Sequence, residues 1–398
     1  MYSHSRIVIN THLLHKEVQE YITNHLNFNI SELRFKKSPF TGISSLELIQ
    51  QIQGKKISQK KFPFLYENNE IIYPPHINLE QASSQSTALF KQSIINGKTG
   101  IDLTGGTGID SFFLSEQTNE FYYVEPNLDL LEIVKHNFTV LGKKNVNFIN
   151  KTAEEFISSN STHFDFIYLD PSRRDENKNK KINLKDLFPN ILNLKDTLFK
   201  FSKSIFSKLS PLLDLQRAID QLPISKIYIV SIKNETKELI VQLNPEDKIN
   251  LSNPYVHCIN LESGQPDFCY FWQEEKISPV PSYSIPKSYL YIPNSSLLKS
   301  GAFKQLGIKF SIDKLHSNSH IYTSESKIEN FPGRTFILID KNFNPKKTSQ
   351  KQFNIISRNY PLKPEEIKKK YKLVDGGTKY LIFTRSLQGN ICMLAESI

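Results

Sequence analysis

The chain has little cysteine and no long hydrophobic run. Its 398 residues include 3 cysteines, and no two of them form a Cys-x-x-Cys pair. This scarcity argues against a disulfide framework or a zinc site and favours a reducing compartment. No apolar run approaches the roughly 18 residues of a membrane span, and the first residues lack the apolar core of a signal peptide. We therefore expect a soluble, cytoplasmic protein with no membrane partner and no bound metal.

Internal repeats and long low-complexity tracts are also absent from the sequence. Apolar residues make up 38% of the chain and include 27 Phe and 17 Tyr. This composition supplies enough apolar surface for the cores of roughly two or three domains at this length.

Net charge is unevenly distributed along the chain. Residues 276–398 contain 20 Lys and Arg against 8 Asp and Glu, a net charge of +12, whereas residues 1–275 contain 30 against 32, a net charge of −2. A basic module attached to a neutral remainder suggests capture of a polyanion such as RNA. A basic surface that only improves solubility is the alternative.

The segment Asp102-Leu-Thr-Gly-Gly-Thr-Gly108 has the pattern of a turn between a strand and a helix. It follows the apolar run at Thr99 and precedes an amphipathic run that begins at Ile109. Glycines let backbone amides approach a ligand closely, and the start of a helix adds partial positive charge. The backbone at Gly105, Gly106 and Gly108 is therefore a candidate cofactor site.

This turn alone does not identify the cofactor. Glu125 ends the next predicted strand 19 residues after Gly106, a distance that suits binding of ribose hydroxyls in several cofactor classes. A nicotinamide or flavin fingerprint would place its third small residue at Ser111. Asp102 favours a cofactor that carries an ammonium group. A tight turn with no ligand remains the structural alternative.

A second segment, Asp170-Pro-Ser-Arg-Arg174, follows the predicted buried strand Phe164–Leu169. Ligands of open α/β sheets bind at the carboxyl ends of the strands, where this carboxylate would lie. The two segments together predict a group-transfer enzyme in which one loop holds the cofactor and the other faces its reactive end.

The order of these motifs resembles the class I S-adenosylmethionine-dependent methyltransferases over roughly residues 80 to 273. The resemblance implies an α/β, Rossmann-like fold with a seven-stranded, mostly parallel sheet. It also implies that Asp102 and the backbone of Gly105 to Gly108 hold the methionine end of the cofactor and that Glu125 holds the ribose. Thr152 and Ala153 would contact the adenine, although the family often has Asp where this chain has Thr152.

In many nucleic-acid methyltransferases an [Asn/Asp]-Pro-Pro-[aromatic] motif grips an exocyclic amine of a base. By that resemblance Asp170 and the Pro171 carbonyl are the catalytic candidates. This chain departs from the motif, because Ser172 replaces the second proline and Arg173 and Arg174 replace the aromatic residue. A guanidinium can stack on a base or bind phosphate, while a solvated charge run is the alternative.

Carbon methylation usually needs a cysteine nucleophile near this strand, and the cysteines here lie far along the chain. Cys258 and Cys269 fall in apolar strand-like runs, where buried and inert thiols are expected. Nitrogen is therefore the expected methyl acceptor, with oxygen as the alternative.

Other polar residues near predicted strand ends and helix starts have either a functional or a structural interpretation. Gln81, Ser83 and Ser84 lie in a predicted helix entry, Leu79 to Ala88, and serve either the site or helix capping. Lys208, Asp214 and Glu235 either line the target pocket or form ion pairs at the rim of the sheet.

The last part of the chain resembles a THUMP-like module joined by a ferredoxin-like unit to bacterial class I methyltransferases. The resemblance rests on Ser357-Arg-Asn-Tyr-Pro361, the lysines at 368–370, Gly376-Gly377 and Tyr380. It implies a structured RNA substrate. The candidate phosphate contacts are Arg358, Lys368, Lys369 and Lys370, with a solvated helix face as the alternative for the lysines.

We thus expect a helical region over 1–78, a methyltransferase domain over 79–275, a ferredoxin-like unit over 276–325 and a THUMP-like RNA-binding domain over 326–398. The predicted function is S-adenosylmethionine-dependent methylation of a base nitrogen in tRNA or rRNA. The alternatives are a methyltransferase acting on a small molecule or protein, a non-catalytic RNA-binding protein, and a nicotinamide-dependent oxidoreductase, which Asp170-Pro171 and the missing third glycine disfavour.

Overall fold

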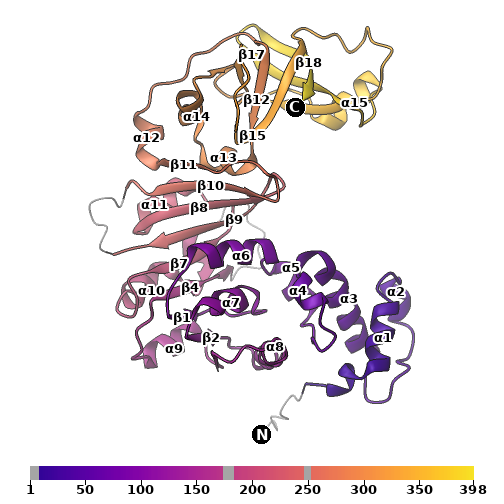
Figure 1. The fold of residues 1–398 in the computed structure, drawn as a ribbon, viewed down its shortest axis with the longest axis vertical. Helices are drawn as coiled ribbons and strands as arrows, with labels where there is room; N and C mark the ends of the chain where they lie inside the picture. Colours follow the sequence, from indigo (N-terminus) through magenta and orange to yellow (C-terminus); the bar gives the residue numbers. More distant parts are fainter. Residues whose placement is uncertain (1–8, 174–182, 246–251) are drawn as a thin grey trace. The chain divides into compact units, whose positions relative to one another are not determined.

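The computed structural model describes residues 9–173, 183–245 and 252–398 (Figure 1). The chain forms two compact units, Met1–Lys208 with Gln242–Glu246 and Leu209–Val241 with Asp247–Ile398. No helix in these described ranges is both long and apolar enough to cross a membrane.

The first unit begins with short helices, which confirms the predicted helical N-terminal region. They are η1 (Thr11–Leu14), α1 (Lys16–Asn24), α2 (Ile30–Leu33), α3 (Ser45–Lys61), α4 (Pro63–Tyr66) and α5 (His76–Gln81). Helix α3 starts with a capping box, in which Ser44 accepts from the Glu47 amide and Glu47 accepts from the Ser44 amide. Apolar residues of α1 and α3 such as Val18, Ile22 and Ile52 pack into one small core.

Parallel strands carry the site in the same unit. They are β1 (Thr99–Asp102), β2 (Glu120–Val124), β3 (Val146–Ile149), β4 (Phe166–Leu169) and β7 (Ile205–Leu209), paired in the order β7-β4-β1-β2-β3. Helix α6 (Gln85–Ile94) precedes β1. The helices that connect the strands are α7 (Ile109–Leu114), η2 (Ser115–Gln117), α8 (Leu128–Val140), α9 (Ala153–Ser159) and α10 (Ile191–Leu198). The predicted strand–turn–helix at Asp102 is confirmed, because β1 and α7 flank the glycine turn. The expected helix Leu79 to Ala88 is instead two helices, since the chain is extended at Ala82 and Ser84.

A short two-stranded sheet follows β4. Strand β5 (Ser172–Arg173) pairs antiparallel with β6 (Leu187–Phe188), and the 3-10 helix η3 (Leu184–Asp186) comes directly before β6. This pairing places Ser172 directly opposite Phe188.

The second unit contributes β8 (Ile224–Ile232), most of β9 (Glu235–Leu243), β10 (Tyr255–Leu261) and β11 (Phe268–Phe271), with helices α11 (Leu215–Gln221) and α12 (Trp272–Ile277). Strand β10 runs parallel to β8 and antiparallel to β11. The hydrogen-bonding order β11-β10-β8-β9-β7-β4-β1-β2-β3 gives 9 strands, so the expected count of seven is wrong. Sequence analysis missed β9, which follows a turn with left-handed Lys233 and Asn234, as in two-residue hairpins.

The C-terminal part forms a second sheet of 7 strands in the order β13-β14-β12-β15-β18-β17-β16. Its strands are β12 (Tyr289–Pro293), β13 (Asp313–Lys314), β14 (Tyr322–Ser324), β15 (Gly333–Asp340), β16 (Asn354–Arg358), β17 (Lys379–Ser386) and β18 (Gly389–Ser397). Its helices are α13 (Ser295–Ser300), α14 (Phe303–Phe310) and α15 (Pro364–Tyr371). Helix α13 ends at Gly301, whose φ is +76°, before α14 begins.

Candidate active site

The glycine turn between β1 and α7 is held by backbone hydrogen bonds. The Gly105 amide donates to the Val124 carbonyl at 2.8 Å, and the Gly108 amide donates to the Gly105 carbonyl at 2.9 Å. Gly108 precedes α7 with a φ of +75°, a left-handed conformation that favours glycine. A Cβ on Gly105 would lie 2.3 Å from the Tyr123 ring. The turn therefore requires glycine at both positions.

A cavity of about 380 Å³ lies where β1, β2, β3 and β4 end. Most of the predicted site residues line it, namely Asp102, Gly105, Gly106, Glu125, Thr152, Ala153, Asp170 and Ser172. Gly108 and Pro171 are not among the lining residues. The fold thus brings the two motifs together at one edge of the sheet, as open α/β sheets do with their ligands.

Asp102 is only 1% exposed. Its Oδ2 accepts a 2.6 Å hydrogen bond from the Ser111 hydroxyl, and its Oδ1 accepts from the Thr104 amide at 2.9 Å and hydroxyl at 3.1 Å. Burial raises the pKa of Asp102 to about 7, although these hydrogen bonds lower it. Asp102 therefore titrates near neutral pH.

Glu125 holds the turn from the neighbouring strand. Its Oε2 accepts from the Gly106 amide at 3.0 Å, and its Oε1 accepts from the Asn127 amide at 2.8 Å. Burial raises the pKa of Glu125 against the opposing effect of these two bonds. The carboxylate is thus fixed in orientation at the cavity wall.

Thr152 caps the helix that starts beside the cavity. Its hydroxyl accepts from the Glu155 amide at 3.2 Å, and the Glu155 carboxylate accepts from the Thr152 amide at 2.8 Å. This capping box explains a threonine at this position without a ligand. Thr152 and Ala153 nevertheless line the cavity, so both stay candidate adenine contacts.

Asp170 is tied to the first loop through Thr104, which sequence analysis missed. The Asp170 amide donates to the Thr104 hydroxyl at 2.6 Å, and that hydroxyl donates to Asp102. The Asp170 Oδ2 lies 2.5 Å from the Lys208 ammonium, whose side chain is 14% exposed. Lys208 thus forms an ion pair with Asp170 at the end of β7, although it is not among the residues that line the cavity.

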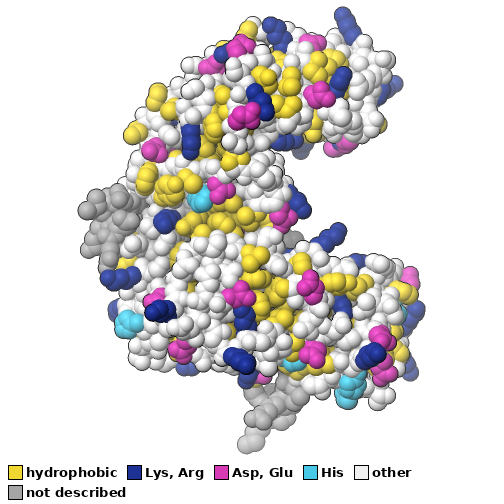
Figure 2. Space-filling view, in the orientation of Figure 1, with side chains coloured by type: hydrophobic (Ala, Val, Ile, Leu, Met, Phe, Trp, Pro, Cys, Tyr) yellow, Lys and Arg dark blue, Asp and Glu magenta, His cyan; other side chains and the backbone are white. Residues whose placement is uncertain are grey.

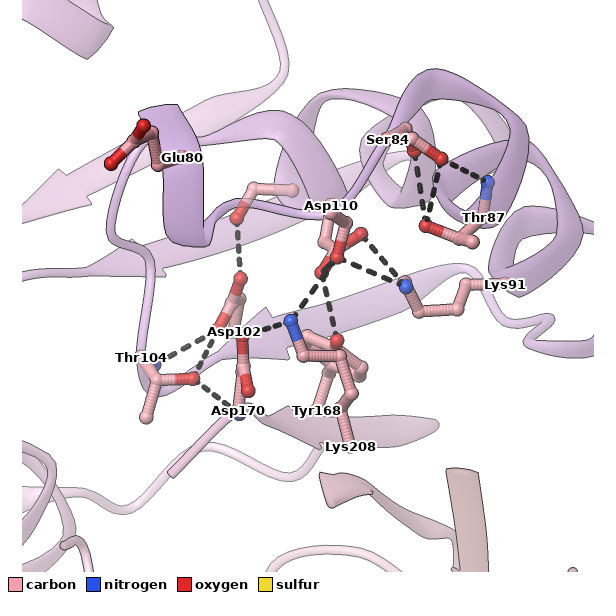
Figure 3. Close-up of polar contacts among 12 residues, drawn as sticks. Glu80, Ser84, Thr87, Lys91, Asp102, Thr104, Asp110, Tyr168, Asp170 and Lys208 are labelled. Atoms are coloured by element: carbon pink, nitrogen blue, oxygen red, sulfur yellow. Dashed lines mark hydrogen bonds and ion pairs between the residues drawn. The ribbon is translucent and has the colours of Figure 1, made fainter. Parts of the chain in front are cut away.

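A buried charge cluster lies behind Asp170 (Figure 3). Asp110 lies 3.2 Å from the Lys91 ammonium and accepts from the Tyr168 hydroxyl at 2.8 Å and the Ser83 hydroxyl at 2.7 Å. Ser83 also accepts from Lys208 at 3.3 Å, which connects the cluster to the ammonium that holds Asp170. Burial raises the pKa of Asp110, but the nearby ammonium groups outweigh it and leave that pKa lowered.

Three other residues singled out in the sequence, Ser84, Asp214 and Glu235, form helix caps or an ion pair, whereas Gln81 lies at the cavity. Ser84 caps α6 by accepting from the Thr87 amide, and Asp214 caps α11 by accepting from the Arg217 amide. Glu235 forms an ion pair with Lys237 at 2.7 Å. Gln81 lines the cavity.

An aromatic side chain lines the cavity from β6, which pairs with the strand that follows Asp170. Pro171 is buried and Ser172 is exposed. Arg174 lies outside the described residues, and of Arg173 the structure describes the backbone in β5. Phe188, opposite Ser172 on β6, lines the cavity together with Pro189. An aromatic ring thus reaches the site from a position 18 residues after Asp170.

Comparison with known proteins assigns each part of this architecture. Residues 85–192 match the family described as conserved hypothetical protein 95, residues 289–332 a ferredoxin-like domain and residues 341–397 a THUMP-like domain. A proposed methyltransferase from Porphyromonas gingivalis W83 aligns with 98% of this chain and 100% of its own, with a TM-score of 0.87 and 28% identity. These matches identify the chain as a methyltransferase.

An uncharacterized RNA methyltransferase from Mycoplasma mobile is 35% identical over 74 residues, which are 19% of this chain. The match spans only 20% of that relative's length.

The four predicted phosphate contacts of this methyltransferase lie in its second unit. Lys368 is held between Glu365 at 2.8 Å and Asp375 at 2.6 Å, whereas Lys369 and Lys370 are exposed. Burial lowers the pKa of Arg358, and the neighbouring Arg334 adds to this effect. Among the residues coloured in Figure 2, basic side chains are interspersed with acidic ones on the face shown. Lys369 and Lys370 are thus the exposed candidates for the expected phosphate contacts, whereas Lys368 is already paired with two carboxylates.

Proposed function

We propose that this methyltransferase transfers the methyl group of S-adenosylmethionine to a base nitrogen in a structured RNA, a tRNA or an rRNA. The observation that carries the proposal is that one cavity holds the glycine turn and Asp170, with Thr104 hydrogen-bonded to both Asp102 and Asp170. Because tRNA and rRNA function in the cytoplasm, the proposal places the enzyme there.

The residues around the turn fit the chemistry of S-adenosylmethionine. The buried Asp102 carboxylate suits the ammonium of the methionine end, and the Glu125 carboxylate suits the two ribose hydroxyls. A Cβ at Gly105 would clash with the Tyr123 ring, so glycine lets the turn pack closely against β2. When bound, this cofactor supplies an electrophilic methyl group on a sulfonium.

Asp170 and the Pro171 carbonyl are the groups we assign to the acceptor. An exocyclic amine of a base is a poor nucleophile because its lone pair is delocalised into the ring. Two oxygens that accept its two hydrogens favour a pyramidal nitrogen and free that lone pair. Holding nitrogen, methyl and sulfur in line supplies up to about 7–11 kcal/mol in favourable cases.

Three observations support RNA as the substrate. Residues 341–397 match a THUMP-like domain, the Mycoplasma mobile relative is named an RNA methyltransferase, and residues 276–398 carry a net charge of +12. We assign methyl transfer to residues 79–275, RNA docking to 326–398, and the ferredoxin-like unit at 276–325 to the connection between them.

The test compares Asp170→Ala with Asp170→Asn. Asn keeps one acceptor oxygen for the amine, so D170N should retain more activity than D170A, which should lose transfer by at least about 100-fold. The measurement is incorporation of labelled methyl into RNA, with S-adenosylmethionine binding by calorimetry expected to be largely unchanged. Wild-type transfer by D170A would contradict the assignment.

A strain that lacks the protein identifies the product. Mass spectrometry of its tRNA and rRNA nucleosides should show the loss of one N-methylated base. An unchanged nucleoside profile, together with methylation of a protein or small molecule by the purified enzyme, would contradict RNA as the substrate.

A further inference from the structure

A cysteine on β11, a histidine on β10 and an aspartate just before β11 lie together, away from the residues used above. His257 on β10 is the direct antiparallel partner of Cys269 on β11, so both side chains project from the same face of the sheet. The His257 Nε2 lies 2.8 Å from the Asp267 Oδ2. This is the order of nucleophile, base and orienting carboxylate found in enzymes with activated thiols.

The surroundings favour the thiolate form of Cys269. Burial raises the pKa of this thiol, but hydrogen bonds with the His257 ring and the Tyr255 hydroxyl outweigh it and lower the pKa. Burial lowers the pKa of His257, yet Asp267 and Cys269 raise it to about 9. Both shifts favour a thiolate at Cys269 beside an imidazolium at His257.

Each element packed around this pair contributes a titratable group. Tyr228 on β8 lies with its ring centroid 5.8 Å from that of His257, and Glu274 on α12 acts on Tyr255. Both tyrosines have raised pKa values and stay neutral near pH 7, Tyr228 chiefly through burial and Tyr255 chiefly through its hydrogen bond to Cys269. Asp267 and Glu274 are thus the negative charges facing the pair.

The other two cysteines differ from Cys269 in these respects. Cys258 is buried, as expected from the sequence, and burial raises its pKa to about 12. Cys392 is partly buried, and burial raises its pKa to about 12. Cys269 was expected to be buried and inert as well, but it is only partly buried, and the adjacent His257 and Asp267 side chains are 23% and 48% exposed.

We propose that Cys269 is a site of covalent oxidation by hydrogen peroxide, with His257 as the proton donor and Asp267 orienting its ring. The sulfur attacks one peroxide oxygen, an S–O bond forms and the O–O bond breaks. Sulfur loses two electrons and becomes a sulfenic acid. The leaving hydroxide takes the proton of the His257 imidazolium and becomes water.

Alkylation rates of the full-length protein test this site. An ordinary thiol is only a few per cent thiolate at pH 7, and burial lowers the thiolate fraction of Cys392 further. Cys269 should therefore react with iodoacetamide at least about tenfold faster than Cys392, measured by peptide mass spectrometry. The substitution His257→Gln should remove most of this difference, and D267N should reduce it. Treatment with hydrogen peroxide and dimedone should label Cys269 before the other two cysteines.

Melting temperature and circular dichroism of each variant check that it is folded. If H257Q does not fold, the wild-type rate against pH still decides, because Cys269 should stay fast well below the pH at which Cys392 slows. Equal rates for Cys269 and Cys392 in the wild-type protein, or an unchanged Cys269 rate in folded H257Q, would overturn the proposal.

Discussion

Two aspartates near the cavity show how immediate neighbours decide the charge of a buried carboxyl. Asp102 is surrounded by hydroxyl and amide donors, and burial raises its pKa to about 7. Asp110 is also buried, but the Lys91 and Lys208 ammonium groups lower its pKa. The positive charges of the ammonium groups outweigh the desolvation of Asp110, whereas the neutral hydrogen-bond donors around Asp102 do not outweigh its desolvation. Asp110 is therefore ionised near neutral pH, whereas the ionisation of Asp102 depends on pH in this range.

We predict that affinity for S-adenosylmethionine depends on pH through Asp102. Its carboxyl must be ionised to attract the ammonium of the ligand, so affinity should rise about tenfold from pH 6 to pH 8. Calorimetry of the wild-type protein and the Asp102→Asn variant measures this, and the variant should show a much flatter profile. The stability of the unliganded protein should depend on pH in the opposite direction. Because folding raises the pKa of Asp102, the contribution of this group to the free energy of unfolding is lost as pH rises through about 7.

We also predict that Lys208 positions Asp170. Its ammonium holds one carboxylate oxygen at 2.5 Å and leaves the other for the acceptor amine. Lys208→Met should lower kcat about 100-fold while KM for RNA and cofactor affinity change little, because a misplacement of about 1 Å has an effect of this size. Lys208→Arg should restore part of kcat. A folded K208M variant with wild-type kcat would contradict this role.

At the scale of elements, the pairing of β5 with β6 changes the interpretation of the Asp-Pro segment. The sequence places arginines where related motifs have an aromatic residue, yet the antiparallel register sets Phe188 opposite Ser172 at the cavity. Buried Leu187 and Ile191 on either side of Phe188 anchor this part of the chain. A side chain distant in sequence is thereby positioned for stacking on a planar base.

Phe188→Ala should raise KM for RNA by roughly 5- to 100-fold, because stacking of one base on an aromatic ring contributes about 1–3 kcal/mol. Phe188→Tyr keeps the ring and should behave nearly as wild type. Steady-state methylation kinetics measure both, with S-adenosylmethionine affinity as the control. Equal KM values for F188A and the wild-type protein would show that the ring does not contact the base.

At the scale of the whole molecule, the charge difference between the two parts of the chain predicts how RNA binds. Replacing Lys369 and Lys370 together with Ala should weaken RNA binding and reduce the salt dependence of log K by about 1.5, near 0.7–0.9 for each lost phosphate contact. Lys368→Ala is the matched control, since Glu365 and Asp375 already neutralise that lysine. Binding measured across a salt series gives the slopes. A larger change for K368A than for the double variant would contradict this assignment.

The sequence by itself determined the order of strands and helices around the cofactor turn. Glycines, apolar strand runs and carboxylates at strand ends act locally, so Asp102, Glu125 and Asp170 could be placed at one edge of a sheet from the sequence alone. Strand β9 was missed because its turn uses left-handed Lys233 and Asn234, without the glycine that usually marks such a hairpin.

Only the tertiary structure decided which distant side chains complete the site. Thr104, Lys91 and Asp110 carry no local signal, since a threonine in a loop and charges on helices are ordinary surface residues by sequence. Their roles arise because parallel strands bring separate loops within hydrogen-bonding distance and exclude water there. The antiparallel pairing of β10 with β11 likewise set His257 beside Cys269, which had been interpreted from the sequence as an inert thiol.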